Sequence, residues 1–399
     1  MPDVEFTNLF AVALIALLAP LLLGLAPRLR VPAVVLEIVA GIVVGPHGLG
    51  LVDVDEPVQI VSLLGLGFLL FLAGLEIDVH RLRGRVLRLA ALGYLVTLAL
   101  GTVAGLGFSA AGWVRSPLLL AVALSATSLG LVVPVLKDAG KVDSTVGQFT
   151  IAAASVADFA AVLVLSLVFS TEGGSAGERL VMVGLFALLV VVAGIVVATA
   201  GRSQRIGGVL VRLQDTTAEI RVRAAVVLLV AFVALAEQFG LETILGAFLA
   251  GAVVGLVDRD ASSHPRFRIK LEALGYGFLI PVFFVTSGLR LDLGGLVDDP
   301  AALARVPLFL LALLVVRGAP ALLSIRSLGG RSTAAVGLLQ ATSLPFIVTA
   351  TQIGVLTGLM APVTGAALVC AGLLSVLMFP SIALLLLKQP VSAASIPPR

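Results

Sequence analysis

The polar tetrapeptide Ala126-Thr127-Ser128-Leu129 recurs 215 residues later as Ala341-Thr342-Ser343-Leu344, and each copy lies in the middle of a long apolar stretch. A further polar residue directly precedes each copy, Ser125 in the first and Gln340 in the second. Polar groups at the depth of a membrane midplane are costly on a lipid-facing helix. The clusters therefore predict two helices that are interrupted inside the protein.

Helix-breaking residues follow both copies: Gly130 and Pro134 after the first, and Pro345 after the second. Backbone groups freed at such breaks line protected cavities in transporters. The simpler interpretation is two continuous helices with a proline kink, in which the Ser and Thr side chains hydrogen-bond to neighbouring helices. We favour the broken helices, because interrupted segments in corresponding halves of a chain are typical of a transport site.

Two other motifs recur in the same order and at nearly the same offset. Residues 40–45 (Ala-Gly-Ile-Val-Val-Gly) resemble 250–255, and 74–79 (Gly-Leu-Glu-Ile-Asp-Val) resemble 288–293. Each offset corresponds to seven apolar segments, an odd number, so equivalent helices would cross the membrane in opposite directions. The sequence thus predicts an inverted-topology repeat with units of about 32–170 and 241–387.

Composition identifies the chain as a polytopic membrane protein. It has 59% hydrophobic and 12% charged residues, with a mean hydropathy of +1.17, whereas soluble domains carry about 25% charged residues. We predict an all-α, single transmembrane domain over 1–399 with about 13 spanning helices of roughly 20 residues. The predicted segments are 5–26, 32–46, 57–76, 86–110, 116–136, 145–170, 179–200, 222–239, 241–257, 271–289, 302–325, 333–356 and 361–387. The first segment and 179–239 would be additions or connectors outside the repeats.

Basic residues are distributed unevenly between the alternate loops of this topology. With the N-terminus outside and the C-terminus in the cytoplasm, 21 of the 26 Lys and Arg residues fall in inner loops and 4 in outer loops. This asymmetry follows the positive-inside rule, so the pI near 9.4 does not indicate nucleic-acid binding. We predict a multi-pass protein of the cell membrane.

Two charges interrupt the apolar segments near their centres. Asp158 is the only charged residue between Asp143 and Glu172, and Arg317 is the only one in 306–325. Burial of a charge at this depth costs roughly 2.5–3.5 kcal/mol on the insertion scale, so such residues are functional candidates. A structural Asp and an Arg that snorkels to the interface are the alternatives. Half-helix ends at the breaks carry partial charges that suit both groups, which places both residues in one predicted site.

The remaining acidic candidates rank lower. Glu37 and Glu237 lie near the ends of predicted segments, while Glu76 and Asp78 fall at the inner end of the third. A membrane-embedded enzyme would show intramembrane His, Cys or paired acids, but the three His are in predicted loops and Cys370 is single. A channel would not need inverted repeats. We therefore predict a transporter, not an enzyme, without a resident metal or cofactor.

Four stretches resemble the monovalent cation:proton antiporters of the second branch (CPA2): 35–50, 71–78, 245–251 and 283–292. The similarity runs in order over essentially the whole chain. It implies a homodimer in membrane lipid, whose subunits each have a dimerisation domain and a core domain with two crossed, broken helices. Asp158 matches the family's ion-binding Asp, and Arg317 matches its basic residue. Transport would proceed by an elevator-like movement of the core.

The chain departs from some members in two respects. Electrogenic members carry two adjacent Asp residues, but here Ala157 precedes Asp158. Potassium-efflux relatives often carry a nucleotide-binding domain, and we expect no such regulatory domain here, because the chain stops at Arg399.

These features predict electroneutral exchange of Na⁺ or K⁺ for H⁺ at Asp158. The predicted ligands are Thr127, Ser128, Thr342, Ser343 and Gln340, beside Arg317. The alternative is a sodium- or proton-coupled organic anion transporter of similar fold, in which Arg317 would pair with the substrate.

Overall fold

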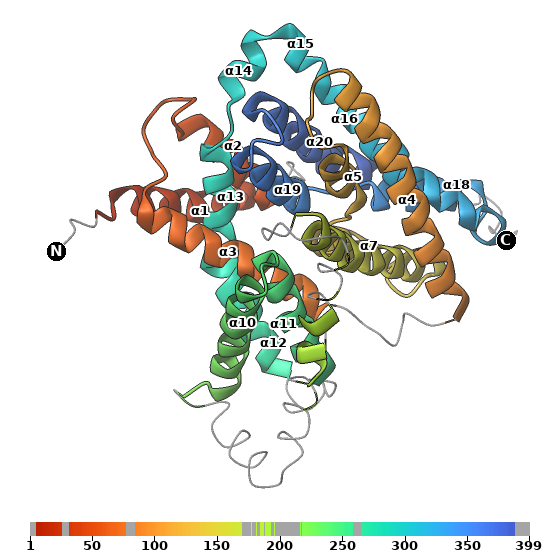
Figure 1. The fold of residues 1–399 in the computed structure, drawn as a ribbon, viewed down its shortest axis with the longest axis horizontal. Helices are drawn as coiled ribbons and strands as arrows, with labels where there is room; N and C mark the ends of the chain where they lie inside the picture. Colours follow the sequence, from red (N-terminus) through yellow and green to blue (C-terminus); the bar gives the residue numbers. More distant parts are fainter. Residues whose placement is uncertain are drawn as a thin grey trace, which may run out of the picture. The chain divides into compact units, whose positions relative to one another are not determined.

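The computed structural model describes residues 5–25, 32–76, 84–169, 216, 218–257 and 265–387, with parts of 177–195. In these residues every element is helical except an isolated bridge between Val114 and Met360. The chain forms two compact units (Figure 1). The first unit comprises Met1–His80 and Phe159–Asp298, and the second comprises Arg81–Asp158 and Asp299–Arg399.

The helices of the first unit are α1 (Thr7–Leu25), α2 (Ala33–Val44), α3 (Glu56–Leu75), α10 (Ile220–Gln238), α11 (Thr243–Val257), α12 (Pro265–Leu274), the π-helical turn η1 (Gly275–Leu279), α13 (Ile280–Leu289) and α14 (Leu293–Asp298). Those of the second are α4 (Gly84–Ala110), α5 (Pro117–Ser125), α6 (Leu129–Asp138), α15 (Pro300–Leu303), α16 (Arg305–Leu313), the π-helical turn η2 (Leu314–Gly318), the 3₁₀-helix η3 (Ala319–Ser324), α17 (Ile325–Leu328), α18 (Gly330–Gln340), α19 (Pro345–Leu356) and α20 (Pro362–Leu387). Helix α7 (Thr145–Phe169) belongs to the second unit up to Asp158.

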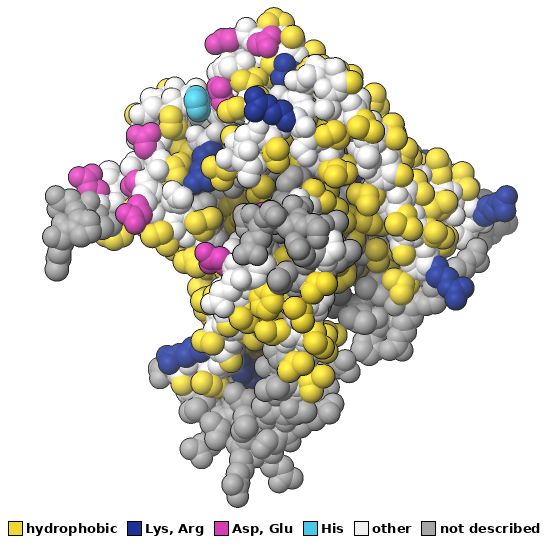
Figure 2. Space-filling view, viewed as in Figure 1, with side chains coloured by type: hydrophobic (Ala, Val, Ile, Leu, Met, Phe, Trp, Pro, Cys, Tyr) yellow, Lys and Arg dark blue, Asp and Glu magenta, His cyan; other side chains and the backbone are white. Residues whose placement is uncertain are grey.

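The all-α polytopic prediction is confirmed. Seven helices in the described part of the chain are long and apolar enough to span a membrane, and the pair α18–α19, bent by 42°, counts as one more. Shorter apolar helices cover Ala33–Val44, Pro117–Val133 and Thr243–Leu256. Hydrophobic side chains cover much of the surface seen in Figure 2, as expected for contact with lipid. The predicted segment 179–200 lies largely outside the described residues, so the number thirteen stays a prediction.

Glycines of the recurring motifs join the helices of the first unit. A Cβ on Gly41 of α2 would collide with the Val285 carbonyl of α13, and one on Gly288 of α13 would collide with the Ile38 carbonyl. Figure 1 shows α2 and α13 side by side. Only glycine permits this close approach of two backbones.

The same arrangement occurs between α3 and α11. A Cβ on Gly74 would meet the Phe248 carbonyl, and one on Gly251 would meet the Phe71 carbonyl. Gly41 and Gly251 are equivalent in the first recurring motif, as Gly74 and Gly288 are in the second. Each of the two contacts therefore joins one motif helix from each predicted repeat, which is the crosswise packing expected of a pseudo-twofold relation.

Both predicted helix interruptions occur in the second unit. Helix α5 ends at Ser125 and α6 begins at Leu129, while α18 ends at Gln340 and α19 begins at Pro345. Pro345 occupies the first turn of α19, where its missing N–H leaves no hydrogen bond unmade. The first break lies at the polar cluster, as predicted, and the helix-breaking residues Gly130 and Pro134 lie within α6 beside it. The non-helical residues are the polar ones that precede them, Ala126–Ser128.

Candidate functional site

The two breaks contact each other directly. The Ser128 N–H donates to the Thr342 carbonyl at 2.9 Å, and the Thr127 hydroxyl donates to the Gln340 carbonyl at 2.6 Å. Helices α5 and α18 end here and α6 and α19 begin here, so two partly negative and two partly positive helix ends meet. The predicted crossing of two broken helices is thus formed by the recurring tetrapeptides themselves.

Asp158 of α7 binds the first break. One carboxylate oxygen, Oδ1, accepts a hydrogen bond from the Thr127 N–H at 3.1 Å. The Asp158 side chain is half-buried, whereas the preceding Ala157 is fully buried. The carboxylate is therefore held by a backbone donor at a helix break and remains accessible to a small ion.

Arg317 binds the side chain of the same threonine, whereas Asp158 binds its backbone N–H. Its Nε donates to the Thr127 hydroxyl oxygen at 2.7 Å, and a terminal nitrogen donates to the Ala153 carbonyl at 3.1 Å. The side chain is 2% exposed, so it does not snorkel to an interface. A small cavity beside Arg317 and Gln340 has room for about one water molecule.

Thr127 is the residue that joins these groups. Its N–H binds Asp158, its hydroxyl oxygen accepts from Arg317, and its hydroxyl proton is donated to Gln340 of the other break. The structure thus brings Asp158, Arg317, Thr127 and Gln340 into one hydrogen-bonded cluster.

The other predicted ligands also lie at the crossing. Thr342 is fully buried, and its hydroxyl is engaged with the Leu338 carbonyl at 3.1 Å. The Ser128 side chain does not cap α6. The Ser343 hydroxyl is buried and has no hydrogen-bond partner among the described residues. A buried hydroxyl without a partner is unfavourable, so this oxygen suits an incoming ligand.

Three groups of the cluster were not predicted. The Ala153 carbonyl binds Arg317, Tyr94 on α4 shares a 3.2 Å hydrogen bond with the Ser125 hydroxyl, and Ser375 on α20 binds Ser343. Carbonyls and neutral hydroxyls in apolar helices carry no charge signal. The repeat does not mark Ser375 either, because the residue that lies 215 positions after Asp158 is Leu373.

The secondary acidic candidates belong to the first unit. Glu37 on α2 is 4% exposed, whereas Glu237 on α10 is exposed. Asp78 lies outside the described residues. Glu76 follows the last residue of α3. In the part of the chain that the structure describes, no group of three or more His, Cys, Asp or Glu side chains could hold a metal ion.

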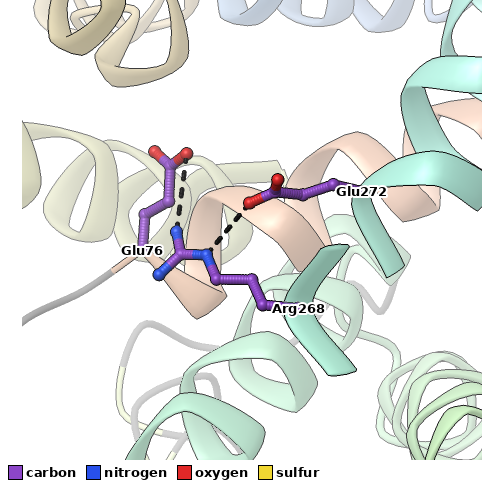
Figure 3. A network of polar contacts seen from close by, with 3 residues as sticks. All are labelled: Glu76, Arg268 and Glu272. Carbon is purple, nitrogen blue, oxygen red and sulfur yellow. Dashed lines mark hydrogen bonds and ion pairs between the residues drawn. The ribbon is translucent and has the colours of Figure 1, made fainter. Parts of the chain in front are cut away.

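Glu76 forms a polar cluster with two residues of α12, shown in Figure 3. Arg268 lies 3.9 Å from its Oε1 atom and donates to Glu272 at 3.0 Å, while the Glu76 Oε2 atom is buried without a hydrogen-bond partner in the described residues. Burial raises the pKa of Glu76 to about 7, which Arg268 opposes and Glu272 reinforces. A position at the C-terminal end of α3 also disfavours a negative charge.

We expect Glu76→Gln to stabilise the protein at alkaline pH. The folded state keeps the Glu76 proton up to about pH 7 and the unfolded state releases it near 4.5, so wild-type stability falls as pH rises between these values. The variant lacks this loss, which is up to about 3 kcal/mol. Thermal unfolding at pH 5 and pH 8 should show a benefit at pH 8 only. Glu272→Gln, which alters the same arginine's partners, is the control, and equal stability of wild type and Glu76→Gln at pH 8 would contradict the assignment.

Comparison with known proteins gives the family. Residues 13–389 match the model of the transmembrane sodium/hydrogen exchangers. The chain belongs to this family. It is 34% identical over 369 residues to the putative Na⁺/H⁺ antiporter YjbQ of Bacillus subtilis, covering 89% of this chain and 58% of that protein. It is 31% identical over 285 residues to the probable Na⁺/H⁺ antiporter 3 of Methanocaldococcus jannaschii, covering 68% of each.

The fold also matches a solved exchanger. The structure of the sodium proton antiporter MjNhaP1 from Methanocaldococcus jannaschii at pH 8 superposes with a TM-score of 0.67 at 19% identity, covering 96% of this chain and 98% of that one. These relatives are transporters, as predicted, and not enzymes. The chain spans 58% of the length of its YjbQ relative.

Proposed function

We propose that the protein exchanges a monovalent cation, Na⁺ or K⁺, for H⁺ across the cell membrane at Asp158. The observation that carries this proposal is a carboxylate held by a backbone N–H at the crossing of two broken helices, beside a fully buried arginine. The printed names of the two relatives describe Na⁺/H⁺ antiporters. Neither name describes an organic anion transporter, so that alternative is not favoured.

Competition for one carboxylate provides the coupling. A proton or a cation neutralises Asp158, and the neutralised site crosses a low-dielectric barrier more easily than the empty, charged one. The unoccupied carboxylate is therefore retained on the side where it lost its ion until another ion binds. Exchange follows from this rule alone, without a step in which both ions are bound.

The stoichiometry follows from the neighbours of Asp158. Ala157 is fully buried and has no titratable group, and Arg317 remains charged at ordinary pH. One titrating carboxylate exchanges one proton for one monovalent cation, so the proposed cycle moves no net charge.

Oxygen atoms around the crossing supply the cation's remaining ligands. Backbone carbonyls freed at helix breaks replace hydration water in ion pathways. The proposed side-chain ligands are Asp158 and the hydroxyls of Ser128 and Ser343. Thr127, Thr342 and Gln340 hold the crossing together, since their side chains or carbonyls are already engaged in it.

The wider arrangement is part of the same proposal. The loop charges favour an outside N-terminus and a cytoplasmic C-terminus. The crosswise glycine packing of α2 with α13 and of α3 with α11 supports inverted repeats over about 32–170 and 241–387. In a homodimer, the compact unit that holds the crossing would carry the ion by an elevator-like movement.

Everted membrane vesicles with a fluorescent pH indicator test the function. Addition of Na⁺ or K⁺ to acidified vesicles should release protons, and the rate should saturate with cation concentration and fall at low pH as protons compete. Proteoliposomes should show no current on a cation jump. Absence of Na⁺-, Li⁺- or K⁺-dependent proton movement between pH 6 and 9 would refute the proposal.

A further inference from the structure

The second break has a side-chain anchor of its own. Ser375 on α20 accepts a hydrogen bond from the Ser343 N–H at 3.2 Å, and its hydroxyl lies 3.1 Å from the Ser343 carbonyl and 2.7 Å from the Gly372 carbonyl. Ser375 is fully buried. A Cβ on Gly372 would lie 3.1 Å from the Ser343 carbonyl, so α20 approaches the break closely where this hydroxyl reaches it.

This contact reproduces the one that Asp158 makes at the first break. Asp158 accepts from the N–H of Thr127, 31 residues before it, and Ser375 accepts from the N–H of Ser343, 32 residues before it. Thr127 is the second residue of the first tetrapeptide and Ser343 is the third residue of the second, so the two contacts differ by one position. The Ser128 N–H to Thr342 carbonyl bond connects the two breaks. Hydrogen-bonded partners thus extend from Asp158 through both breaks to Ser375.

The two anchors differ in one chemical property. Asp158 gains and loses charge as it binds a proton or a cation, whereas the Ser375 hydroxyl stays neutral at any physiological pH. The first break is therefore held by the group that the ions compete for. The second is held by a hydroxyl whose charge does not change when a proton or a cation binds.

We propose that Ser375 is a positioning residue for the transported cation, which it serves by fixing the second break so that the Ser343 hydroxyl faces the ion. This inference rests on the proposed cation exchange. Ser343 is the member of the crossing whose buried hydroxyl has no hydrogen-bond partner in the described residues, although its N–H donates to Ser375 and its carbonyl lies 3.1 Å from the Ser375 hydroxyl. A monovalent cation supplies the partner that this oxygen lacks.

Two variants separate the anchor from the ligand. Ser375→Ala leaves the Ser343 N–H without its acceptor and should raise the apparent KM for the cation about tenfold, within the range expected for one unmade buried hydrogen bond. Ser343→Ala keeps the backbone available to Ser375 and removes only the unbound hydroxyl. It should weaken cation binding by a similar factor without lowering the thermal stability of the cation-free protein.

The measurements are antiport kinetics and cation-dependent thermal stabilisation with Na⁺ and K⁺. The maximal rate of Ser375→Ala should stay within about threefold of wild type, and its pH profile at saturating cation should keep its shape, because one lost hydrogen bond away from Asp158 does not alter the competition for its proton. Ser375→Thr, which keeps the hydroxyl, should restore much of the affinity. Ser381→Ala on the same helix, which removes an exposed hydroxyl that donates to the Leu377 carbonyl, is the control.

Wild-type KM and wild-type cation stabilisation in both Ser375→Ala and Ser343→Ala would overturn the inference, and so would a loss of stability in Ser343→Ala that matches its loss of affinity. These results leave the proposed function standing if the wild type exchanges cations for protons. Absence of exchange in the wild type itself would remove both.

Discussion

Asparagine in place of Asp158 is expected to reduce cation-driven proton exchange to the level of empty vesicles while the protein stays folded. The amide oxygen of asparagine can still accept the Thr127 N–H, so the first break keeps its anchor. The amide cannot take up a proton or carry a negative charge. The variant therefore can bind neither the proton nor the cation, although replacing one carboxylate oxygen with an amide nitrogen preserves the geometry.

The measurement is proton release from everted vesicles on addition of Na⁺, K⁺ or Li⁺, with expression and thermal stability determined in parallel. Asp143→Asn, an exposed acid just before the same helix, is the matched control and should exchange like wild type. Exchange at the wild-type rate in Asp158→Asn would exclude Asp158 as the shared site. Loss of exchange in the control as well would show that the effect is not specific to the crossing.

The membrane architecture could be predicted because a spanning helix leaves a strong hydropathy signal. Helices α3, α7 and α20 follow the predicted 57–76, 145–170 and 361–387 within a few residues. The breaks could also be predicted, because Thr and Ser at midplane depth need partners that an unbroken lipid-facing helix does not offer. Both signals arise from desolvation, which acts on each segment separately.

The exact position of the first break could not be predicted from local propensity. Gly130 and Pro134 are the helix-breaking residues, yet they lie within α6. The chain leaves the helix at Thr127 and Ser128 instead, where bonds to Asp158, Gln340 and Thr342 replace those of the helix. Tertiary partners more than 30 residues away decide the position, and no single-segment pattern contains them.

Charges in the candidate site could be identified, but their neutral partners could not. Asp158 and Arg317 stand out as isolated charges, whereas Tyr94 and Ser375 are ordinary residues of apolar helices. Glu37 ranked lower because it lies near the end of its predicted segment, yet it is 4% exposed and so nearly as buried as Arg317; it belongs to the first unit and not to the unit that holds the breaks. Sequence shows that a buried charge is unusual, and only the fold shows which charges share a site.

The local structure at Arg317 depends on a proline that follows it. Arg317 lies in the π-helical turn η2, and Pro320 lies in the first turn of the 3₁₀-helix η3. Pro320 has no N–H to donate to the Val316 carbonyl, which removes one α-helical hydrogen bond at this point. The change of helical register across 314–324 accompanies the full burial of the Arg317 side chain.

Alanine in place of Arg317 is expected to cause the largest loss of stability in the second unit. The substitution removes a fully buried guanidinium that binds Thr127 and Ala153, and it leaves a cavity beside the crossing. It also removes the positive charge of Arg317, which interacts with the negative charge of Asp158. Loss of one member of a buried charged group costs about 3–5 kcal/mol. We expect a large fall in the thermal unfolding temperature and no measurable exchange.

Lysine at the same position separates charge from geometry. Its ammonium keeps the positive charge but cannot reproduce the planar guanidinium, whose Nε and terminal nitrogen reach two partners on different segments. The loss of one of these bonds should cost about 1–2 kcal/mol, so Arg317→Lys should fold and exchange at a reduced rate.

Arg331→Ala, which removes an exposed arginine on α18, controls for removal of a positive charge and should unfold at the wild-type temperature. If Arg317→Ala unfolds at that temperature too, the guanidinium does not hold the crossing together. If Arg317→Lys is as unstable as Arg317→Ala, the two directed hydrogen bonds stabilise the crossing, and the charge alone does not.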